Sequence, residues 1–369
     1  MESKLYIFGA HSRARTLKEY IENVYPDTKV QAFLVDNDEP NPAEADGIPV
    51  IHLDERGEQN ALDRLDRSFP VYLGMKSVNH GQPTSHLKKL GFEKIIPMTV
   101  EMDTELRNRY LFKVFHEAGE AFLKLESFGG MSSAVVSDEL AKRMRIYVAS
   151  SVFDGQLKEA HSFHDFEQVI QVGCALTDKR LVNAVYDNNG ESISEKNAQF
   201  CELTALYWIW KNAKDDYAGL EHYRRFFVLP EDIVDVMERN EIGVILPVPL
   251  YVAPNVAENY RSRHVEKVWN DMMDILQERH PEDGKAAETF FAQGLYSPCN
   301  MLIARKDIYD GMCEWMFPIL FEVVKRNGTQ TDRYQNRYPG FLSERLMSFY
   351  FWRHRADIKL VYADKVFLQ

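Results

Sequence analysis

The pattern of apolar and polar positions is clearest between Ser192 and Phe227. Ser192 followed by Glu195 fits a capping box, which predicts that a helix begins here. Apolar side chains then recur at helical spacing as far as Trp210, and the other faces are apolar too, so we expect one continuous, well-buried helix. After a polar turn, the short apolar run 217–220 predicts an interior strand.

A cluster of polar side chains directly follows this strand. It holds an acid, an imidazole, a phenol and two guanidiniums: Glu221, His222, Tyr223, Arg224 and Arg225. In open α/β sheets, ligands bind outside the carboxyl ends of strands. A guanidinium presents a planar fork of donors that suits phosphate oxygens. The cluster therefore indicates a diphosphate site, and the alternative is a solvated charged turn.

Strand-like and helix-like segments alternate along all 369 residues, which predicts an α/β fold. This length exceeds one average domain, and the Gly/Ser-rich run 128–137 is typical of a linker. We predict a small Rossmann-like domain at 1–125, a linker at 126–143 and a second α/β domain at 144–369.

The first domain opens like a βαβ unit, with a strand before Gly9, a helix from Ser12 and a second strand that ends at Asp36. Asp36 lies where dinucleotide-binding folds place a ribose-binding acid. The second and third glycines of that fingerprint are missing, so the backbone cannot approach a pyrophosphate closely and no NAD is expected. The domain resembles the nucleotide-sugar-binding domain of bacterial sugar O-acyltransferases, and a docking or regulatory module is an equal alternative.

Composition excludes several classes. A net charge of −12 argues against non-specific nucleic-acid binding, and 45% hydrophobic residues argue against disorder. The four cysteines form no CxxC pair, which favours a reducing compartment. We see neither a signal peptide nor a run long enough to cross a bilayer. The sequence therefore predicts a cytoplasmic protein, at most peripheral to the inner face of the cell membrane.

Two segments also resemble a known family. The motifs SISEKN, CELTALYWIWKN and YAGLEHYRRFF within 192–227, and YPGFLSERL at 338–346, are similar to the signature of DUF4422, a domain found in bacterial capsule and exopolysaccharide clusters. Members of that family are regarded as glycosyltransferases with a GT-A-like fold, and some transfer galactose in its pyranose or furanose form. The resemblance covers roughly 145–369, so the second domain is expected to be GT-A-like.

The resemblance implies transfer of a sugar, expected to be galactose in either ring form, from a UDP-sugar to a growing capsular polysaccharide or exopolysaccharide. The alternative is a non-catalytic nucleotide-sugar-binding or assembly protein. In the family's fold, loops after the first strands and the start of the signature helix hold the donor. The donor-binding candidates are Ser150, Gln171, Gly173, Asn188, Asn197, Arg224, Arg225 and Asn300. Each of them also has an ordinary structural alternative.

Enzymes of this fold usually carry Asp-x-Asp where this chain has Glu221-His222-Tyr223. Glu221 and His222 could still hold Mn²⁺ or Mg²⁺. Alternatively, Arg224 and Arg225 neutralise the diphosphate without a metal.

Inverting transfer needs a carboxylate that takes the proton of the acceptor hydroxyl. Glu344, expected at the start of a helix, is the first candidate, and Glu221, His222 and Asp332 follow it. The alternative for Glu344 is a charge that complements the helix dipole. The acceptor would be a saccharide or a lipid-linked saccharide. The aromatic and basic run 349–355 could contact a lipid-linked acceptor at the membrane surface, or could form a buried helix with a polar rim.

Overall fold

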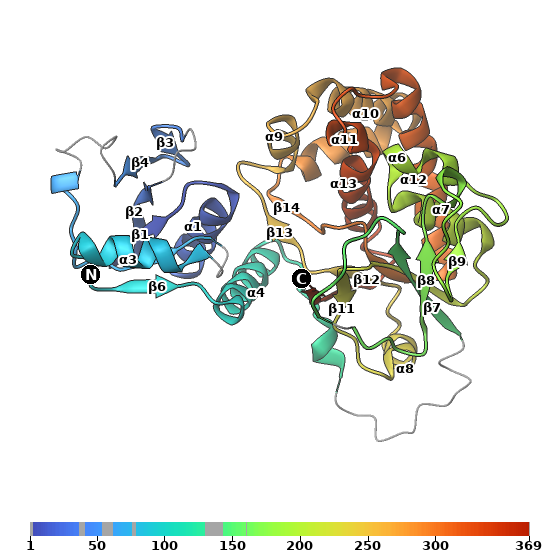
Figure 1. Cartoon of the computed structure of the whole chain (residues 1–369), viewed down its shortest axis with the longest axis horizontal. Helices are drawn as coiled ribbons and strands as arrows, with labels where there is room; N and C mark the ends of the chain where they lie inside the picture. The colour runs from blue at the N-terminus through green and yellow to red at the C-terminus, as the bar shows by residue number, and fades with distance from the viewer. Residues whose placement is uncertain are drawn as a thin grey trace. The chain divides into compact units, whose positions relative to one another are not determined.

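The computed structural model describes residues 3–36, 41–53, 62–75, 79–129, 143–159 and 161–368, which form two compact units (Figure 1). The first unit comprises Met1–Phe122 and Tyr251–Pro254, and the second comprises Leu123–Leu250 and Asn255–Gln369. Most of the expected linker lies outside the described residues. Its beginning, however, belongs to a 3-10 helix, η2 (Leu125–Phe128), and Leu125 packs in the core of the second unit.

The first unit is built on a six-stranded sheet in the order β3-β4-β2-β1-β5-β6. All neighbouring pairs except β3 with β4 are parallel. Its strands are β1 (Ser3–Phe8), β2 (Thr28–Val35), β3 (Glu44–Ala45), β4 (Ile48–His52), β5 (Val71–Leu73) and β6 (Ile95–Pro97). Its helices are α1 (Ser12–Val24), α3 (Gly81–Lys89) and α4 (Val100–Glu117). The strand order reverses at β1, as it does in doubly wound Rossmann-like sheets.

Asp36 follows the end of β2, as the sequence predicts. Its carboxylate pairs with Nδ1 of His86, from α3, at 2.9 Å. A ribose hydroxyl would have to compete with this imidazole for the carboxylate.

The second unit is built on a mixed nine-stranded sheet, in which β16-β12-β15-β10-β7-β8-β9 form a continuous path and β11 and β17 extend it from β10. Strands β7 to β10 of this path run parallel, whereas β15 runs antiparallel to both β10 and β12. The strands are β7 (Met144–Ser150), β8 (Glu167–Gln171), β9 (Val185–Tyr186), β10 (Tyr217–His222), β11 (Arg225–Phe227), β12 (Val244–Pro247), β15 (Leu302–Arg305), β16 (Leu360–Ala363) and β17 (Lys365–Phe367). The α/β prediction is therefore confirmed.

Helices cover both faces of this sheet. The helices are α6 (Asn197–Phe200), α7 (Leu203–Asn212), α8 (Ile233–Arg239), α9 (Val256–Arg261), α10 (Glu266–Arg279), α11 (Pro281–Phe291), α12 (Lys306–Asn327) and α13 (Tyr338–Arg353). Ile146 of β7 packs in one core with α8, while its neighbour Tyr147 meets Trp208 of α7. Because successive strand residues point to opposite faces, α7 and α8 lie on opposite sides of the sheet (Figure 1).

The signature segment is not one continuous helix, so that prediction was wrong. A 3-10 turn at Ser194–Lys196 leads into α6, and Cys201, with a φ of +49°, separates α6 from α7. Ser192 does not form the capping box either, because its hydroxyl donates to the Asp187 carbonyl and accepts from the amide of Ser194. The Ser192 side chain therefore ties the start of the segment to the Asp187 backbone.

The aromatic run 349–355 begins within the interior. Phe349 and Phe351 are buried, and the Trp352 ring lies 5.3 Å from that of Phe290. These rings follow the buried-helix alternative, and membrane contact stays a prediction. No helix within the described ranges could cross a bilayer, since none is both long and apolar enough.

Candidate functional site

The polar candidates gather at one edge of the second sheet. Strands β7, β8 and β10 are parallel, and the pairs Ser150–Gln171 and Ala149–His222 bring their carboxyl ends together. Strand β15 runs the other way, so the loop that precedes it, 297–301, arrives at this same edge. We name the carboxyl-edge site as the group Glu202, His222, Arg225, Cys299, Asn300 and Glu344.

The backbone is strained at this site. Of the six described non-glycine residues with a left-handed φ angle, three lie at or beside this site: Cys201 at +49°, Cys299 at +83° and Asn300 at +51°. Such conformations are unfavourable for residues with a Cβ, and they concentrate at functional sites. Their convergence on one edge is an independent reason to place function here.

Asn300 holds the strained loop in place. Its Nδ2 donates to Glu202 Oε1 at 2.9 Å and to the Gly340 carbonyl at 3.0 Å, while its Oδ1 accepts from the Ser343 hydroxyl at 2.7 Å. The side chain is buried, and both polar atoms are engaged within the protein. The sugar contact predicted for Asn300 stays a prediction, and it would require one of these bonds to open.

Glu344 is the carboxylate best placed for proton transfer. Its Oε1 accepts from the amide of Cys299 at 2.7 Å, and its Oε2 accepts from Arg345 at 2.8 Å. Burial raises the pKa of Glu344, against the opposing effects of Arg345 and the Cys299 amide. The side chain remains 19% exposed, so it is reachable from solvent. Glu344 lies well inside α13 rather than at its start, so its expected position was wrong and the helix-dipole alternative loses its basis.

His222 lies beside a guanidinium. Its Nδ1 is 3.5 Å from a terminal nitrogen of Arg225. Burial lowers the pKa of His222, Arg225 and Arg337 act in the same direction, and Glu202 opposes them. The imidazole is therefore neutral at neutral pH, which leaves it able to accept a proton or bind a cation.

Glu221 faces away from His222, because adjacent strand residues point to opposite faces. It is fully buried, and its Oε1 accepts from the amide of Phe227 at 2.6 Å. Burial, together with the neighbouring Glu167 carboxyl, raises the pKa of Glu221 well above its usual range. One cation held by both Glu221 and His222 is disfavoured by this arrangement. Within the described ranges, no three His, Cys, Asp or Glu side chains form a metal-binding group. The metal stays a prediction.

The two neighbouring arginines diverge. Arg225 lies 5.4 Å from the ring of Phe367 and acts electrostatically on both His222 and Glu344. Arg224 reaches the loop after β7, where it packs against Gly155. In the part of the chain that the structure describes, neither arginine forms an ion pair with a carboxylate. Both are therefore available to an anion, from two sides of the turn.

The donor candidates near β8 have mixed placements. Gln171 is fully buried and bonds the 179–181 loop, through the Lys179 carbonyl at 2.9 Å and the Leu181 amide at 2.6 Å. Asn188 is exposed in its turn. Ser150 ends β7 half-buried, and its hydroxyl lies 3.3 Å from the Val148 carbonyl. Of these three, Ser150 and Asn188 keep surface that a donor could touch.

Gly173 and Asn197 fit against each other. Gly173 has a φ of +71°, and a Cβ there would lie 2.7 Å from Oδ1 of Asn197. The side-chain Nδ2 of Asn197 donates to the Cys201 carbonyl at 2.8 Å and to the Thr204 hydroxyl at 3.1 Å. Asn197 thus supports the loop at Gly173, and a ligand contact would come in addition to this structural role.

Sequence reasoning missed Asp187 and Glu202. Asp187 is fully buried and accepts from four groups: the amides of Gly173 and Cys174 and the hydroxyls of Ser194 and Thr204. Glu202 binds Asn300 across the site. A carboxylate within the apolar signature CELTALYWIW was the signal that could have revealed Glu202.

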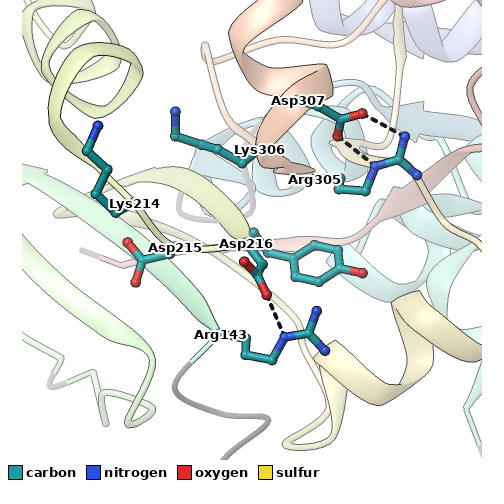
Figure 2. A pocket seen from close by; sticks show the side chains of 8 residues that line it. Arg143, Lys214, Asp215, Asp216, Arg305, Lys306 and Asp307 are labelled. Carbon is teal, nitrogen blue, oxygen red and sulfur yellow. Dashed lines mark hydrogen bonds and ion pairs between the residues drawn. The ribbon is translucent and has the colours of Figure 1, made fainter.

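A hollow of about 470 Å³ lies at the opposite edge of the sheet, where β10 begins (Figure 2). Its walls are Arg143, Lys214, Asp215, Asp216, Tyr217, Arg305, Lys306 and Asp307. Figure 2 shows Arg143 turned to Asp216 and Arg305 turned to Asp307, and both ion pairs measure 2.6 Å. Since these charges pair with each other at the amino end of β10, we do not place the site here.

Comparisons with known proteins identify the family of this chain. The profile described as "Domain of unknown function (DUF4422)" matches residues 157–355, just over half of the chain, and this range includes all six residues of the carboxyl-edge site. No curated protein matches. Among solved structures, the apo form of the bifunctional glycosyltransferase WbbM is similar in fold, with a TM-score of 0.55 and 24% identity over 61% of this chain and 45% of that one. The chain thus spans less than half of WbbM. The profile match shows that this chain belongs to the DUF4422 family.

Proposed function

We propose that the second unit is a glycosyltransferase that moves a sugar, galactose in its pyranose or furanose form, from a UDP-sugar to a growing capsular polysaccharide or exopolysaccharide. One observation carries this proposal: the solvent-reachable carboxylate of Glu344 shares an edge of the sheet with Arg225, a guanidinium without a carboxylate partner among the described residues. The fold likeness to WbbM supports the same reaction class.

In this reaction, the acceptor hydroxyl oxygen attacks the anomeric carbon while the bond from that carbon to the diphosphate oxygen breaks. The hydroxyl proton passes to Glu344, whose raised pKa makes it a better base near neutral pH than an ordinary carboxylate. The departing diphosphate gains charge, which Arg225 neutralises from one side and Arg224 from the other. Glu344 thus acts on the attacking hydroxyl, and the two arginines act on the departing diphosphate.

A bound Mn²⁺ or Mg²⁺ would supply further positive charge at the diphosphate. Of the two predicted ligands, His222 faces the carboxyl-edge site with a neutral imidazole, which suits Mn²⁺ better than Mg²⁺. We also propose that the reaction takes place in the cytoplasm, at the inner face of the membrane where a lipid-linked acceptor would lie.

The second candidate function is a non-catalytic nucleotide-sugar-binding or assembly protein. It is favoured by one feature, the replacement of Asp-x-Asp by Glu221-His222-Tyr223, in which Glu221 faces a buried region rather than the site. Under this alternative, the chain binds a UDP-sugar without turning it over. A docking or regulatory role of the first unit is compatible with both candidate functions.

A thermal-shift series tests donor binding, with UDP, UDP-galactose, UDP-glucose, GDP-mannose and NAD, each in Mn²⁺ or EDTA. A ligand that binds only the folded state at a hundredfold excess over its Kd stabilises it by about 2.7 kcal/mol. We expect a shift with UDP-galactose that Arg225→Gln reduces and Arg64→Gln, an exposed charge change in the first unit, leaves intact. A shift with NAD and none with UDP ligands contradicts the proposal.

Catalysis is then tested by UDP release from UDP-galactose in the presence of membrane-extracted acceptor. Glu344→Gln should lower kcat by roughly 10²–10⁴-fold, the usual contribution of a general base, while the UDP shift stays unchanged. Binding of UDP-galactose with no turnover by the unaltered chain, and no effect of Glu344→Gln, would favour the non-catalytic alternative.

A further inference from the structure

A group of rings and arginines lies on the surface of the second unit. We call it the ring–arginine patch, and its members are Arg263, His264, Arg333, Tyr334, Arg337 and Phe341. The His264 ring stacks on Phe341 at 4.1 Å and 23°, and Tyr334 lies 5.0 Å from the same ring. Tyr334 is 55% exposed, so the ring group presents an apolar surface to solvent.

The patch is fixed by hydrogen bonds rather than formed by loose side chains. Gln335 donates to the Arg263 carbonyl at 2.9 Å, and its Oε1 lies 3.3 Å from Nδ1 of His264. Asp332 accepts from the amide of Gln335 at 2.7 Å, which caps the turn that carries Tyr334. A ligand would therefore meet a surface that is already arranged.

The arginines of the patch have no carboxylate partners. Arg263, Arg333 and Arg337 are exposed, and none forms an ion pair with a carboxylate in the described ranges. Burial lowers the pKa of His264 to about 4, with Arg345 acting in the same direction, so its ring is neutral at neutral pH. Three unpaired guanidiniums in a chain of net charge −12 form a local positive surface that favours an anion.

The patch adjoins the carboxyl-edge site. Nε of Arg337 donates to Sγ of Cys201 at 3.0 Å, and Cys201 immediately precedes Glu202. Arg337 also acts electrostatically on His222. Phe341 and Glu344 lie on the same helix, α13. A chain bound along the patch would thus lead toward the proposed base.

We propose that the ring–arginine patch is a binding subsite for an anionic saccharide chain, in which sugar rings pack on Tyr334 and carboxylate or phosphate groups bind the arginines. Guanidinium forks match both kinds of oxyanion, whereas a neutral glycan would use only the rings. Its assignment as the acceptor subsite rests on the proposed function, but the binding itself does not.

Isothermal titration of the full chain, in excess UDP so that the proposed diphosphate site at Arg224 and Arg225 is filled, tests the proposal with three probes: hexagalacturonate, maltohexaose as its neutral counterpart, and inorganic pyrophosphate. Hexagalacturonate or pyrophosphate should bind more tightly than maltohexaose, and more weakly as ionic strength rises from about 0.05 to about 0.5 M. Arg333→Gln and Arg337→Gln should each weaken anion binding roughly three- to tenfold, within the range of exposed charge pairs and charged hydrogen bonds. Arg64→Gln is the matched control, and Tyr334→Ala should weaken hexagalacturonate but not pyrophosphate.

If the arginine substitutions weaken the binding of hexagalacturonate, the anion is assigned to sugar carboxylates. If they weaken the binding of pyrophosphate alone, the anion is assigned to phosphate groups. Equal binding of maltohexaose, or unchanged anion binding by both arginine variants, overturns the proposal. The melting temperature of each variant without ligand reports its folding, and the shift of that temperature with UDP reports donor binding. Anion binding at the patch without any UDP shift would retain the subsite and reject the glycosyltransferase.

Discussion

Asp187→Asn is the substitution for which the structure gives the most direct expectation. The carboxylate is fully buried: Oδ1 accepts from the amide of Cys174 and the hydroxyl of Ser194, and Oδ2 accepts from the amide of Gly173 and the hydroxyl of Thr204. Asparagine keeps the shape but replaces one oxygen with an amino group. Two of the four groups that donate to the carboxylate then face this amino group, which cannot accept from them.

The least costly orientation places the new amino group at Oδ2. Thr204 can turn its hydroxyl to the Cys201 carbonyl, 3.1 Å away, whereas the amide of Gly173 is left without an acceptor. One unsatisfied buried amide costs about 1–3 kcal/mol, and the two bonds that remain each lose about 1 kcal/mol because the acceptor is no longer charged. The sum is a loss of about 3–5 kcal/mol in the free energy of unfolding.

Urea unfolding followed by tryptophan fluorescence measures this loss. All five tryptophans, at 208, 210, 269, 315 and 352, lie in the second unit, so the signal reports on that unit alone. Asp307→Asn is the control: its side chain is 64% exposed and forms its ion pair with the exposed Arg305, so we expect a loss below about 1 kcal/mol. A loss below about 1 kcal/mol for Asp187→Asn, with an unchanged m value, would falsify the four-donor arrangement.

Two further predictions concern the same unit. Because the folded pKa of Glu221 is raised, its contribution to stability is complete below the unfolded pKa and is lost as the pH rises through the folded value. Glu221→Gln stays uncharged and can donate to Glu167, so its stability relative to the parent should increase as the pH rises above the ordinary pKa of a glutamate, and parallel pH curves would contradict this. Gly173→Ala should cost about 1–3 kcal/mol in thermal unfolding, since its Cβ would collide with Asn197 at a φ of +71°. Gly119→Ala, with a φ of +73° and no atom within 4 Å, isolates the cost of φ alone, and equal losses would exclude the collision.

The α/β class followed from the sequence because apolar periodicity reports which faces are buried. It predicted the α/β class, the interior strand 217–220 and the polar cluster at its carboxyl end. Periodicity does not report backbone angles, so the break at Cys201 was invisible because apolar positions keep their helical spacing across it. Glu202, which accepts from Asn300 across the site, directly follows that break.

The roles of buried polar residues were harder to infer, because their partners are distant in sequence. Gln171 was read as a nucleotide contact, yet its amide holds the 179–181 loop. Asn300 was read as a sugar contact, yet it joins Glu202 to α13. A single sequence contains the residue but not its tertiary partner, so ligand binding and structural bonding predict the same residue types at such positions.

The replacement of Asp-x-Asp has a geometric consequence for the proposed chemistry. In an extended strand, residues i and i+2 share a face, so two acids at this spacing can hold one cation together. Here the first of these positions is Glu221, whose carboxyl is engaged with the Phe227 amide and faces Glu167 on the buried side. Only the intervening residue, His222, is directed to the carboxyl-edge site. The proposal therefore gives Arg225 the larger share in neutralising the diphosphate, and Arg225→Gln should reduce UDP binding more than EDTA does.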